Sequence, residues 1–420
     1  MDNNNPNDVI PLGKAIFVIM AIVLPIVILV VVAMLFMFTD LFTPAPQDVV
    51  EEVVDPHVYD VQHVEEIYME GRPDLEPGEV ITFAGTGFHG STDGLLAEFN
   101  MPSAVAVGVG NQIIVADSFN NVLRLISQDQ NVTTLAGVVH TAGPERFPVG
   151  LFIDGPAWTA GFYRPSGIAV QSNRIFIADS ENHAIRVLVN GRVYTVSGEL
   201  GSGHADGEAG ASMFDTPISL AVGPGGYLYV ADTGNHVVRR ISPGGYVTTI
   251  AGVPGQSGFA DGAAAEALFY DPMGIIVAPD GRVFVADTGN HLIRVVSGGI
   301  VSTMAGSRVL GDLTEYDDGW DDAPLGDHAD GLGGLARFNQ PMGLDLWGGY
   351  LIVADSANHM IRKIGTNGAV TTLAGSGYPN YMSGLYHVAE FHFPTDVYVF
   401  GDFLFIADSG NNKIRLMRLE

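Results

Sequence analysis

Six aspartate–arginine pairs are the most conspicuous ionisable pattern in this 420-residue sequence. In every pair the arginine follows the aspartate by seven residues, a spacing that places the two side chains across one β-hairpin. There a carboxylate can accept hydrogen bonds from turn amides and pair with a guanidinium. Because a feature repeated six times does not define one asymmetric site, we interpret the pairs as structural. They are Asp117–Arg124, Asp179–Arg186, Asp232–Arg239, Asp287–Arg294, Asp355–Arg362 and Asp408–Arg415.

The histidines do not predict a metal site. Four of them recur in the turn after the aspartate, namely His183, His236, His291 and His359. Their repetition from unit to unit separates them in space, which is unsuited to a shared metal. The Asp-Gly pairs that begin at Asp206, Asp261 and Asp330 are typical of turns.

Two connections between the repeated units are longer than the others, and long structured loops are where binding usually occurs. The connection from Gly137 to Pro165 is aromatic, and the connection from Gly306 to Pro341 is acidic. They precede the second and fifth units of six, so we expect them on opposite sides of one mouth of a central channel. The predicted partner-binding residues are Phe147, Phe152, Trp158 and Trp320. The predicted acidic loop residues, which would steer a partner, are Asp317, Asp318, Asp321 and Asp322.

The acidic loop offers the carboxylate oxygens that calcium prefers, although its spacing is not that of a known calcium loop. We therefore predict no cofactor and keep calcium as the alternative to a solvated loop. No nucleophile elbow, zinc-binding helix motif, phosphate loop or dinucleotide fingerprint is present, so no catalytic residue is predicted.

The elements that position these residues follow from the repeat itself. In each unit a proline begins a short apolar strand, a second strand ends in Ala-Asp, a third carries the arginine, and an alternating strand such as VTTIAG follows. Four-stranded units of this kind are typical of β-propeller blades. The fold class is therefore an all-β, six-bladed β-propeller over residues 79–420. The last unit lacks its outer strand, and Glu79–Gly85 supplies the missing strand ahead of the first unit, which should close the ring and remove exposed sheet edges.

These motifs resemble the NHL-repeat family, whose signature letters stand here as Asn290-His291-Leu292. Asn121 and Asn412 replace the histidine in the first and last units. The resemblance covers Glu79 to Glu420 and implies a six-bladed propeller. It also leaves an alternative, because some similar six-bladed propellers are metal-dependent lyases or lactonases.

The N-terminal region has a different composition. After a short tail (residues 1–14), Ala15–Phe38 contains no charged residue and is long enough to cross a membrane as a helix. Residues 39–78 form an acidic, proline-containing linker. Lys14 precedes the apolar segment, so the positive-inside rule predicts a cytoplasmic N-terminus and an extracytoplasmic propeller. A long apolar helix with a soluble head is also similar to a type IV pilin, although no glutamate follows the start of the apolar run.

Charge limits the choice of partners. The formal net charge is −28, and such an acidic surface repels nucleic-acid phosphates, so we expect no nucleic-acid binding. The sequence has no cysteine, which excludes disulfides and thiolate chemistry. The resulting prediction is a membrane-anchored, non-catalytic scaffold that binds a protein partner or neighbouring subunits in a larger membrane complex. The alternatives are a metal-dependent propeller enzyme and a pilin-like filament subunit.

Overall fold

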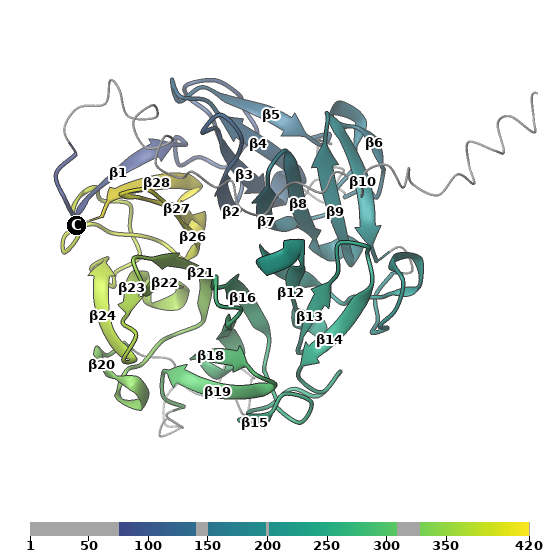
Figure 1. Cartoon of the computed structure of the whole chain (residues 1–420). Coiled ribbons are helices and arrows are strands. Elements are labelled where there is room, and N and C mark those ends of the chain that lie inside the picture. Colours follow the sequence, from purple (N-terminus) through teal and green to yellow (C-terminus); the bar gives the residue numbers. More distant parts are fainter. Residues whose placement is uncertain (1–74, 140–149, 199–200, 309–327, 420) are drawn as a thin grey trace, which may run out of the picture. The chain divides into compact units, whose positions relative to one another are not determined.

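The propeller predicted from the repeats is the fold of the protein (Figure 1). The computed structural model describes residues 75–139, 150–198, 201–308 and 328–419. Each blade is an antiparallel sheet of four main strands, with the first strand innermost. The predicted tail, membrane helix and most of the linker lie outside the described residues. Within those residues, no helix is both long and apolar enough to cross a membrane.

The first three blades follow one another along the chain. Blade 1 contains β2 (Pro102–Val107), β3 (Ile113–Asp117), β4 (Val122–Ile126) and β5 (Val132–Ala136). Blade 2 contains β7 (Pro165–Gln171), β8 (Arg174–Asp179), β9 (Ala184–Val189) and β10 (Arg192–Ser197). Blade 3 contains β11 (Pro217–Val222), β12 (Leu228–Asp232), β13 (Val237–Ile241) and β14 (Val247–Ala251).

The other three blades repeat this plan, except that blade 6 takes its outer strand from the start of the propeller. Blade 4 contains β16 (Pro272–Val277), β17 (Val283–Asp287), β18 (Leu292–Ser297) and β19 (Ile300–Ala305). Blade 5 contains β21 (Pro341–Trp347), β22 (Tyr350–Asp355), β23 (Met360–Ile364) and β24 (Ala369–Ala374). Blade 6 contains β26 (Pro394–Phe400), β27 (Phe403–Asp408), β28 (Lys413–Arg418) and β1 (Glu79–Ala84). Every inner strand begins with proline, which a first residue on an edge strand tolerates because it needs no N–H donor there.

Short elements complete the blades. Two-residue strands pair with the outer strand of their own blade: β6 (Gly155–Pro156), β15 (Gly262–Ala263), β20 (Gly331–Leu332) and β25 (Gly384–Leu385). One-turn 3-10 helices fill the second hairpin of each blade: η4 (Ser118–Asn120), η6 (Ser180–Asn182), η9 (Thr233–Asn235), η10 (Thr288–Asn290), η12 (Ser356–Asn358) and η13 (Ser409–Asn411). The remaining 3-10 turns are η5 (Ala157–Thr159), η7 (Ala209–Ala211), η8 (Pro224–Gly226) and η11 (Gly333–Leu335).

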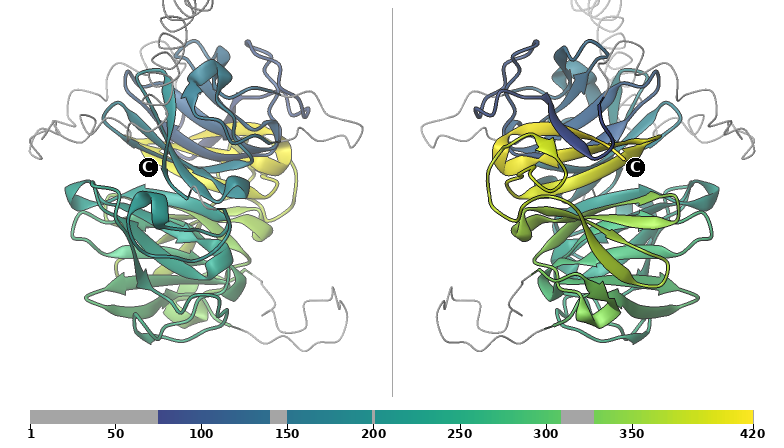
Figure 2. Two further views of the ribbon diagram at one scale, coloured as in Figure 1. Left: turned by 90° about the vertical axis from the view of Figure 1, so that its right-hand side faces the viewer. Right: turned by 90° about the vertical axis from the view of Figure 1, so that its left-hand side faces the viewer.

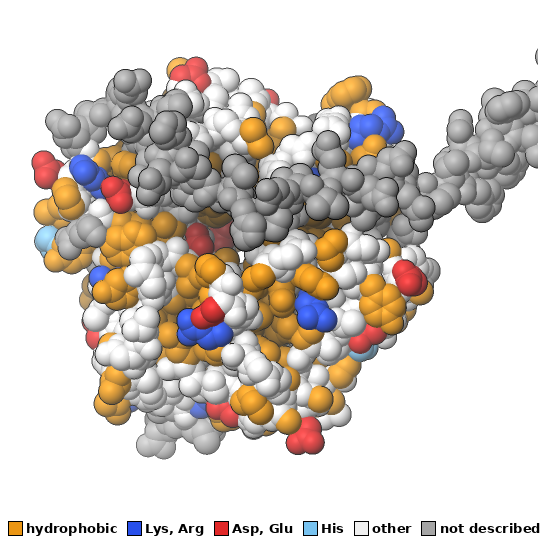
Figure 3. All heavy atoms as spheres, in the orientation of Figure 1, with side chains coloured by type: hydrophobic (Ala, Val, Ile, Leu, Met, Phe, Trp, Pro, Cys, Tyr) orange, Lys and Arg blue, Asp and Glu red, His pale blue; other side chains and the backbone are white. Residues whose placement is uncertain are grey.

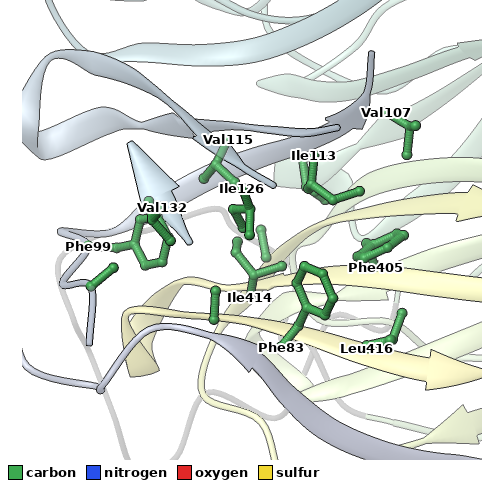
Figure 4. Close-up of a cluster of buried hydrophobic side chains, with 14 of the residues drawn as sticks. Phe83, Phe99, Val107, Ile113, Val115, Ile126, Val132, Phe405, Ile414 and Leu416 are labelled. Atoms are coloured by element: carbon green, nitrogen blue, oxygen red, sulfur yellow. The ribbon is translucent and has the colours of Figure 1, made fainter. Parts of the chain in front are cut away.

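Ring closure occurs as predicted. Strand β1 pairs antiparallel with β28, with Val80 opposite Met417 and Ala84 opposite Ile414 (Figure 2). Phe83 of β1 packs edge-on against Phe405 at a centroid distance of 5.2 Å. Figure 4 shows the buried cluster around this contact, in which side chains of blade 1 meet side chains of blade 6. The two ends of the propeller are therefore joined by both a strand ladder and a hydrophobic core.

The core is divided among the blade interfaces. Six clusters of buried apolar side chains each contain residues of two neighbouring blades, so that every interface around the ring has one. This arrangement explains the alternating apolar pattern, because both faces of a blade are covered by its neighbours. The interfaces hold the inner strands, and hence the channel between them, in fixed positions.

Candidate functional site

The aspartate–arginine pairs are buried inside the blades, as their repetition predicted. In blade 4, Arg294 donates to Asp287 at 2.5 Å, and both side chains are fully buried. Asp287 also accepts hydrogen bonds from the backbone N–H of Tyr270 and the side chain of Asn290. Desolvation raises the pKa of Asp287 to about 6, against the lowering effect of Arg294. These groups are enclosed on all sides and offer no open position to a substrate.

A second aspartate also contacts each repeat arginine except the last, and three of these aspartates, Asp206, Asp261 and Asp330, were predicted to lie in turns. Arg294 donates to Asp261 at 2.6 Å, and Asp261 in turn accepts from the backbone N–H of Thr303 on the outer strand. The corresponding aspartates are Asp93, Asp154, Asp206 and Asp330. In blade 6 Ser383 takes this place, 3.2 Å from Arg415. The Asp-Gly turns therefore fasten the loops that lead into blades 1 to 5 to their own blades.

The turn histidines connect neighbouring blades. His291 adopts a left-handed conformation (φ 58°), and its Nδ1 accepts a hydrogen bond from the backbone N–H of Gln340 at 2.9 Å. His183, His236 and His359 make the same bond to the following blade. Asn121 and Asn412 supply a side-chain oxygen instead. The variation between histidine and asparagine is thus a conservative exchange of hydrogen-bond acceptors.

The aromatic loop lies elsewhere than expected. Its described part runs along the outer strand of blade 2, where β6 pairs with β10 and Ala157 donates to the carbonyl of Gly191. Trp158 is consequently at the outer edge of the blade, 74% exposed, and does not stand at the channel mouth. Phe152 is half-exposed and lies over the guanidinium of Arg186 at 4.6 Å. The displacement arises because the Asp154-Gly155 turn ties the loop to the outer strand.

The other predicted binding residues fall outside the described residues. They are Phe147, Trp320, Asp317, Asp318, Asp321 and Asp322. The calcium alternative for the acidic loop likewise stays a prediction. Among the residues that the structure describes, no group of three or more histidine or acidic side chains is arranged to hold a metal ion.

Exposed apolar side chains also gather on the loops that lead into blades 6 and 1, which the sequence analysis did not predict as a binding surface. We call the set Phe88, Leu95, Leu96, Tyr378, Tyr381 and Met382 the blade 6–1 surface; all six are more than half exposed. The second hairpin of blade 6 lies between the two loops. There Asn411 donates to the carbonyl of Asn380, Asn412 donates to that of Gly87, and the Lys413 ammonium lies 4.6 Å from the Tyr381 ring.

A cavity occupies the central channel of the propeller. The cavity has a volume of about 480 Å³, and all six inner strands line it. At the end nearest the second hairpins, Arg164 pairs with Glu181 at 3.3 Å and stacks over Phe119 at 4.6 Å. Hairpin positions equivalent to Phe119 and Glu181 are glycine or alanine in blades 3 to 6, so this end of the channel is asymmetric.

Two aspartates line the channel between blades 5, 6 and 1. Asp345 on β21 accepts a hydrogen bond from the backbone N–H of Val399 at 2.6 Å. Asp396 on β26 accepts one from the backbone N–H of Val105 at 3.0 Å. The two carboxylates thus connect inner strands that belong to successive blades.

Burial dominates the electrostatics of these carboxylates. Desolvation raises the pKa of Asp345 to about 7 and that of Asp396 to about 8, and the charge of Asp345 adds to the second shift. The sequence reading missed both residues. The sequence did contain a signal. Apart from Ser219 and Tyr398, the residues that occupy the positions of Asp345 and Asp396 in the other inner strands are small or apolar.

The fold and repeat geometry define a six-bladed β-propeller, and parts of its sequence match repeat families. The NHL repeat model matches residues 162–188 and 269–296, and the LVIVD repeat model matches residues 219–238 and 394–412. The NHL resemblance of the sequence is thereby confirmed at the level of the repeat.

Named relatives share this region. The chain is 30% identical to Protein SUPPRESSOR OF QUENCHING 1, chloroplastic, of Arabidopsis thaliana over 67% of this chain and 27% of that protein. It is 27% identical to NHL repeat-containing protein 2 of Bos taurus over 74% of this chain and 45% of that protein. The match therefore spans less than half the length of either relative.

Solved structures support the same fold. A Bacteroides thetaiotaomicron protein of unknown function superposes with a TM-score of 0.60 at 21% identity, over 81% of this chain and 76% of that one. An auxiliary nutrient binding protein of Bacteroides ovatus gives a TM-score of 0.57 at 15% identity, over 80% and 76%. At these identities the likeness concerns the fold alone.

Proposed function

We propose that this propeller is a non-catalytic protein-binding module that contacts its partner through the loops leading into blades 6, 1 and 2. One observation carries the proposal. Of the twenty large apolar side chains exposed in the described part of the chain, thirteen lie on these three loops, and one lies on the loops into blades 3 and 4. Exposed apolar side chains gathered in this way mark interaction surfaces.

The chemistry of these loops suits a protein partner. Phe88, Tyr378, Tyr381 and Trp158 are large aromatic side chains, and residues of this kind dominate interface energies once they are buried. Figure 3 shows one face of the ring, on which Lys and Arg side chains are few and scattered. Together with the net charge of −28, this favours a protein partner with a basic rim over a nucleic acid.

The N-terminal segment gives the proposal a cellular setting. Ala15–Phe38, if it forms the predicted membrane helix, would hold the propeller at the extracytoplasmic surface beside neighbouring subunits. The same segment would serve a pilin-like filament subunit, which remains the alternative assembly.

The test compares matched surface variants of the full chain, purified in mild detergent. Tyr381→Ser and Trp158→Ser should each weaken binding of the co-purifying partner by about 2 kcal/mol, roughly 30-fold in Kd. Leu335→Ser is the control, because Leu335 is 75% exposed but lies on the loop into blade 5. Equal losses for all three variants, or no loss for the first two, would place the binding surface elsewhere.

A further inference from the structure

The channel is large enough for a ligand of its own. A volume of about 480 Å³ lies within the range of small-molecule sites, which are concave, mostly apolar and equipped with a few placed polar groups. Here Ile168, Leu220, Ile275 and Leu344 contribute apolar surface from four different blades. The two acidic residues of the inner strands, Asp345 and Asp396, both lie on the side of blades 5 and 6.

The two carboxylates share one region of the channel. Gly343, two residues before Asp345 on the same strand, leaves room for the neighbouring carboxylate, since a Cβ there would lie 2.5 Å from Oδ1 of Asp396. Asp345 raises the pKa of Asp396 through its charge, which is a second sign that the groups are close. Their negative charges therefore act on the same part of the cavity.

No cation in the described part of the chain compensates these charges. Neither aspartate has an ion-pair partner there. The two carboxylates accept hydrogen bonds from the backbone N–H groups of Leu346, Val399 and Val105. Arg164, the one basic side chain among the described residues that line the cavity, is paired with Glu181. A low-dielectric cavity with two uncompensated carboxylates concentrates a cation.

We propose that the central channel binds a small organic cation, with its ammonium group between Asp345 and Asp396 and its apolar body against the inner strands. This site is independent of the protein-binding surface on the loops. A bare metal ion fits less well, because divalent ions take six or more oxygen ligands or several histidine and acidic side chains, and the described residues hold no such group.

The experiment uses the full chain and two isosteric probes. Calorimetric titration at pH 9, where both carboxylates are ionised, should show 2-phenylethylamine binding at least tenfold more tightly than the uncharged 2-phenylethanol. In the double variant Asp345→Asn/Asp396→Asn the preference for the amine should disappear. Asp402→Asn removes an exposed charge from the same blade and should leave the preference intact.

Proton release is an independent readout. The pKa values of the two aspartates are raised to about 7 and about 8, so bound ammonium should displace protons from them at pH 7. The binding enthalpy should then depend on the ionisation enthalpy of the buffer in the wild type and not in the double variant. A thermal melt of each variant confirms that it is folded. Equal affinity for amine and alcohol, no saturable binding of either probe, or tighter binding of Ca²⁺ than of the amine would overturn the proposal.

Discussion

Each of the first five repeat arginines is held by two aspartates that differ in burial, which separates their contributions to stability. Asp287 is fully buried against Arg294, whereas the side chain of Asp261 is 40% exposed. Removing one partner of a buried ion pair leaves the other charge uncompensated, whereas a partly solvated ion pair contributes little. The first aspartate should therefore matter far more than the second.

We predict that Asp287→Ala lowers the free energy of unfolding by about 3 kcal/mol. Asp261→Ala, which acts on the same arginine, should cost about 1 kcal/mol or less, since Arg294 keeps Asp287 and two backbone carbonyls. Denaturant unfolding of both variants measures the difference. Similar costs would mean that solvent reaches Asp287.

The turn histidine offers a second prediction at this scale. His291→Asn should change stability by less than about 0.5 kcal/mol, because Asn121 and Asn412 already make the same inter-blade bond from the same left-handed conformation. His291→Ala should cost about 1–2 kcal/mol, because it loses the acceptor and retains the strained backbone. If the two variants unfold at the same denaturant concentration, the inter-blade bond contributes nothing.

Among the elements, β1 carries the closure of the ring. It contributes the fully buried Val80 and the nearly buried Phe83 to two different interface clusters. Without it, the edges of β28 and of the blade 6 interface would be open, and an open edge pairs with other chains.

We predict that deleting Glu79–Gly85 makes the propeller form larger oligomers than the intact chain does, or unfold in part. A synthetic peptide of the same sequence, EVITFAG, should restore the oligomeric state of the intact chain by strand addition, while a scrambled peptide should not. Size-exclusion chromatography with and without peptide gives the result. A deletion variant with the same elution volume and melting transition as the intact chain would contradict the closure argument.

The sequence predicted those elements whose signals are local and repeated. Six blades, the closing strand and the Asp287–Arg294 type of pair all follow from short patterns that recur. The contact between Arg294 and Asp261 did not follow, because the two residues are 33 positions apart and meet only after the loop folds onto its blade. The expected position of Trp158 at the channel mouth was wrong for the same reason, because the loop that carries it folds onto the outer strand of its blade.

At the scale of the whole molecule, the repeats do not predict how the blades differ from one another. Asp345 and Asp396 lie in strands whose other residues are mostly apolar. The bonds that these aspartates make depend on which strand of the next blade lies beside them. The blade 6–1 surface could not be predicted from the sequence either, because the exposure of Phe88 and Tyr381 depends on the hairpin that separates their loops. The residues that recur in every blade build the ring, and the residues that depart from the repeat make its blades differ from one another.

The channel carboxylates link the stability of the ring to pH. Their pKa values are raised in the folded state to about 7 for Asp345 and about 8 for Asp396, from 3.8. A raised pKa means that the folded state favours the protonated form. The resulting stabilisation is fully present below about pH 4 and is lost as the pH rises through 7 and 8.

We therefore predict that the wild type loses stability, relative to Asp345→Asn/Asp396→Asn, on the order of a few kcal/mol between pH 4 and pH 9. The double variant should start lower, because an asparagine amide cannot accept both of the N–H bonds that Asp345 receives. The informative quantity is consequently the slope of stability against pH rather than its level. Urea unfolding across this range measures that slope, with Asp402→Asn, which removes one exposed carboxylate from the same blade, as the control. Parallel curves for wild type and double variant would show that the pKa values of the two carboxylates in the folded ring equal those in the unfolded chain, because solvent in the channel hydrates them equally well.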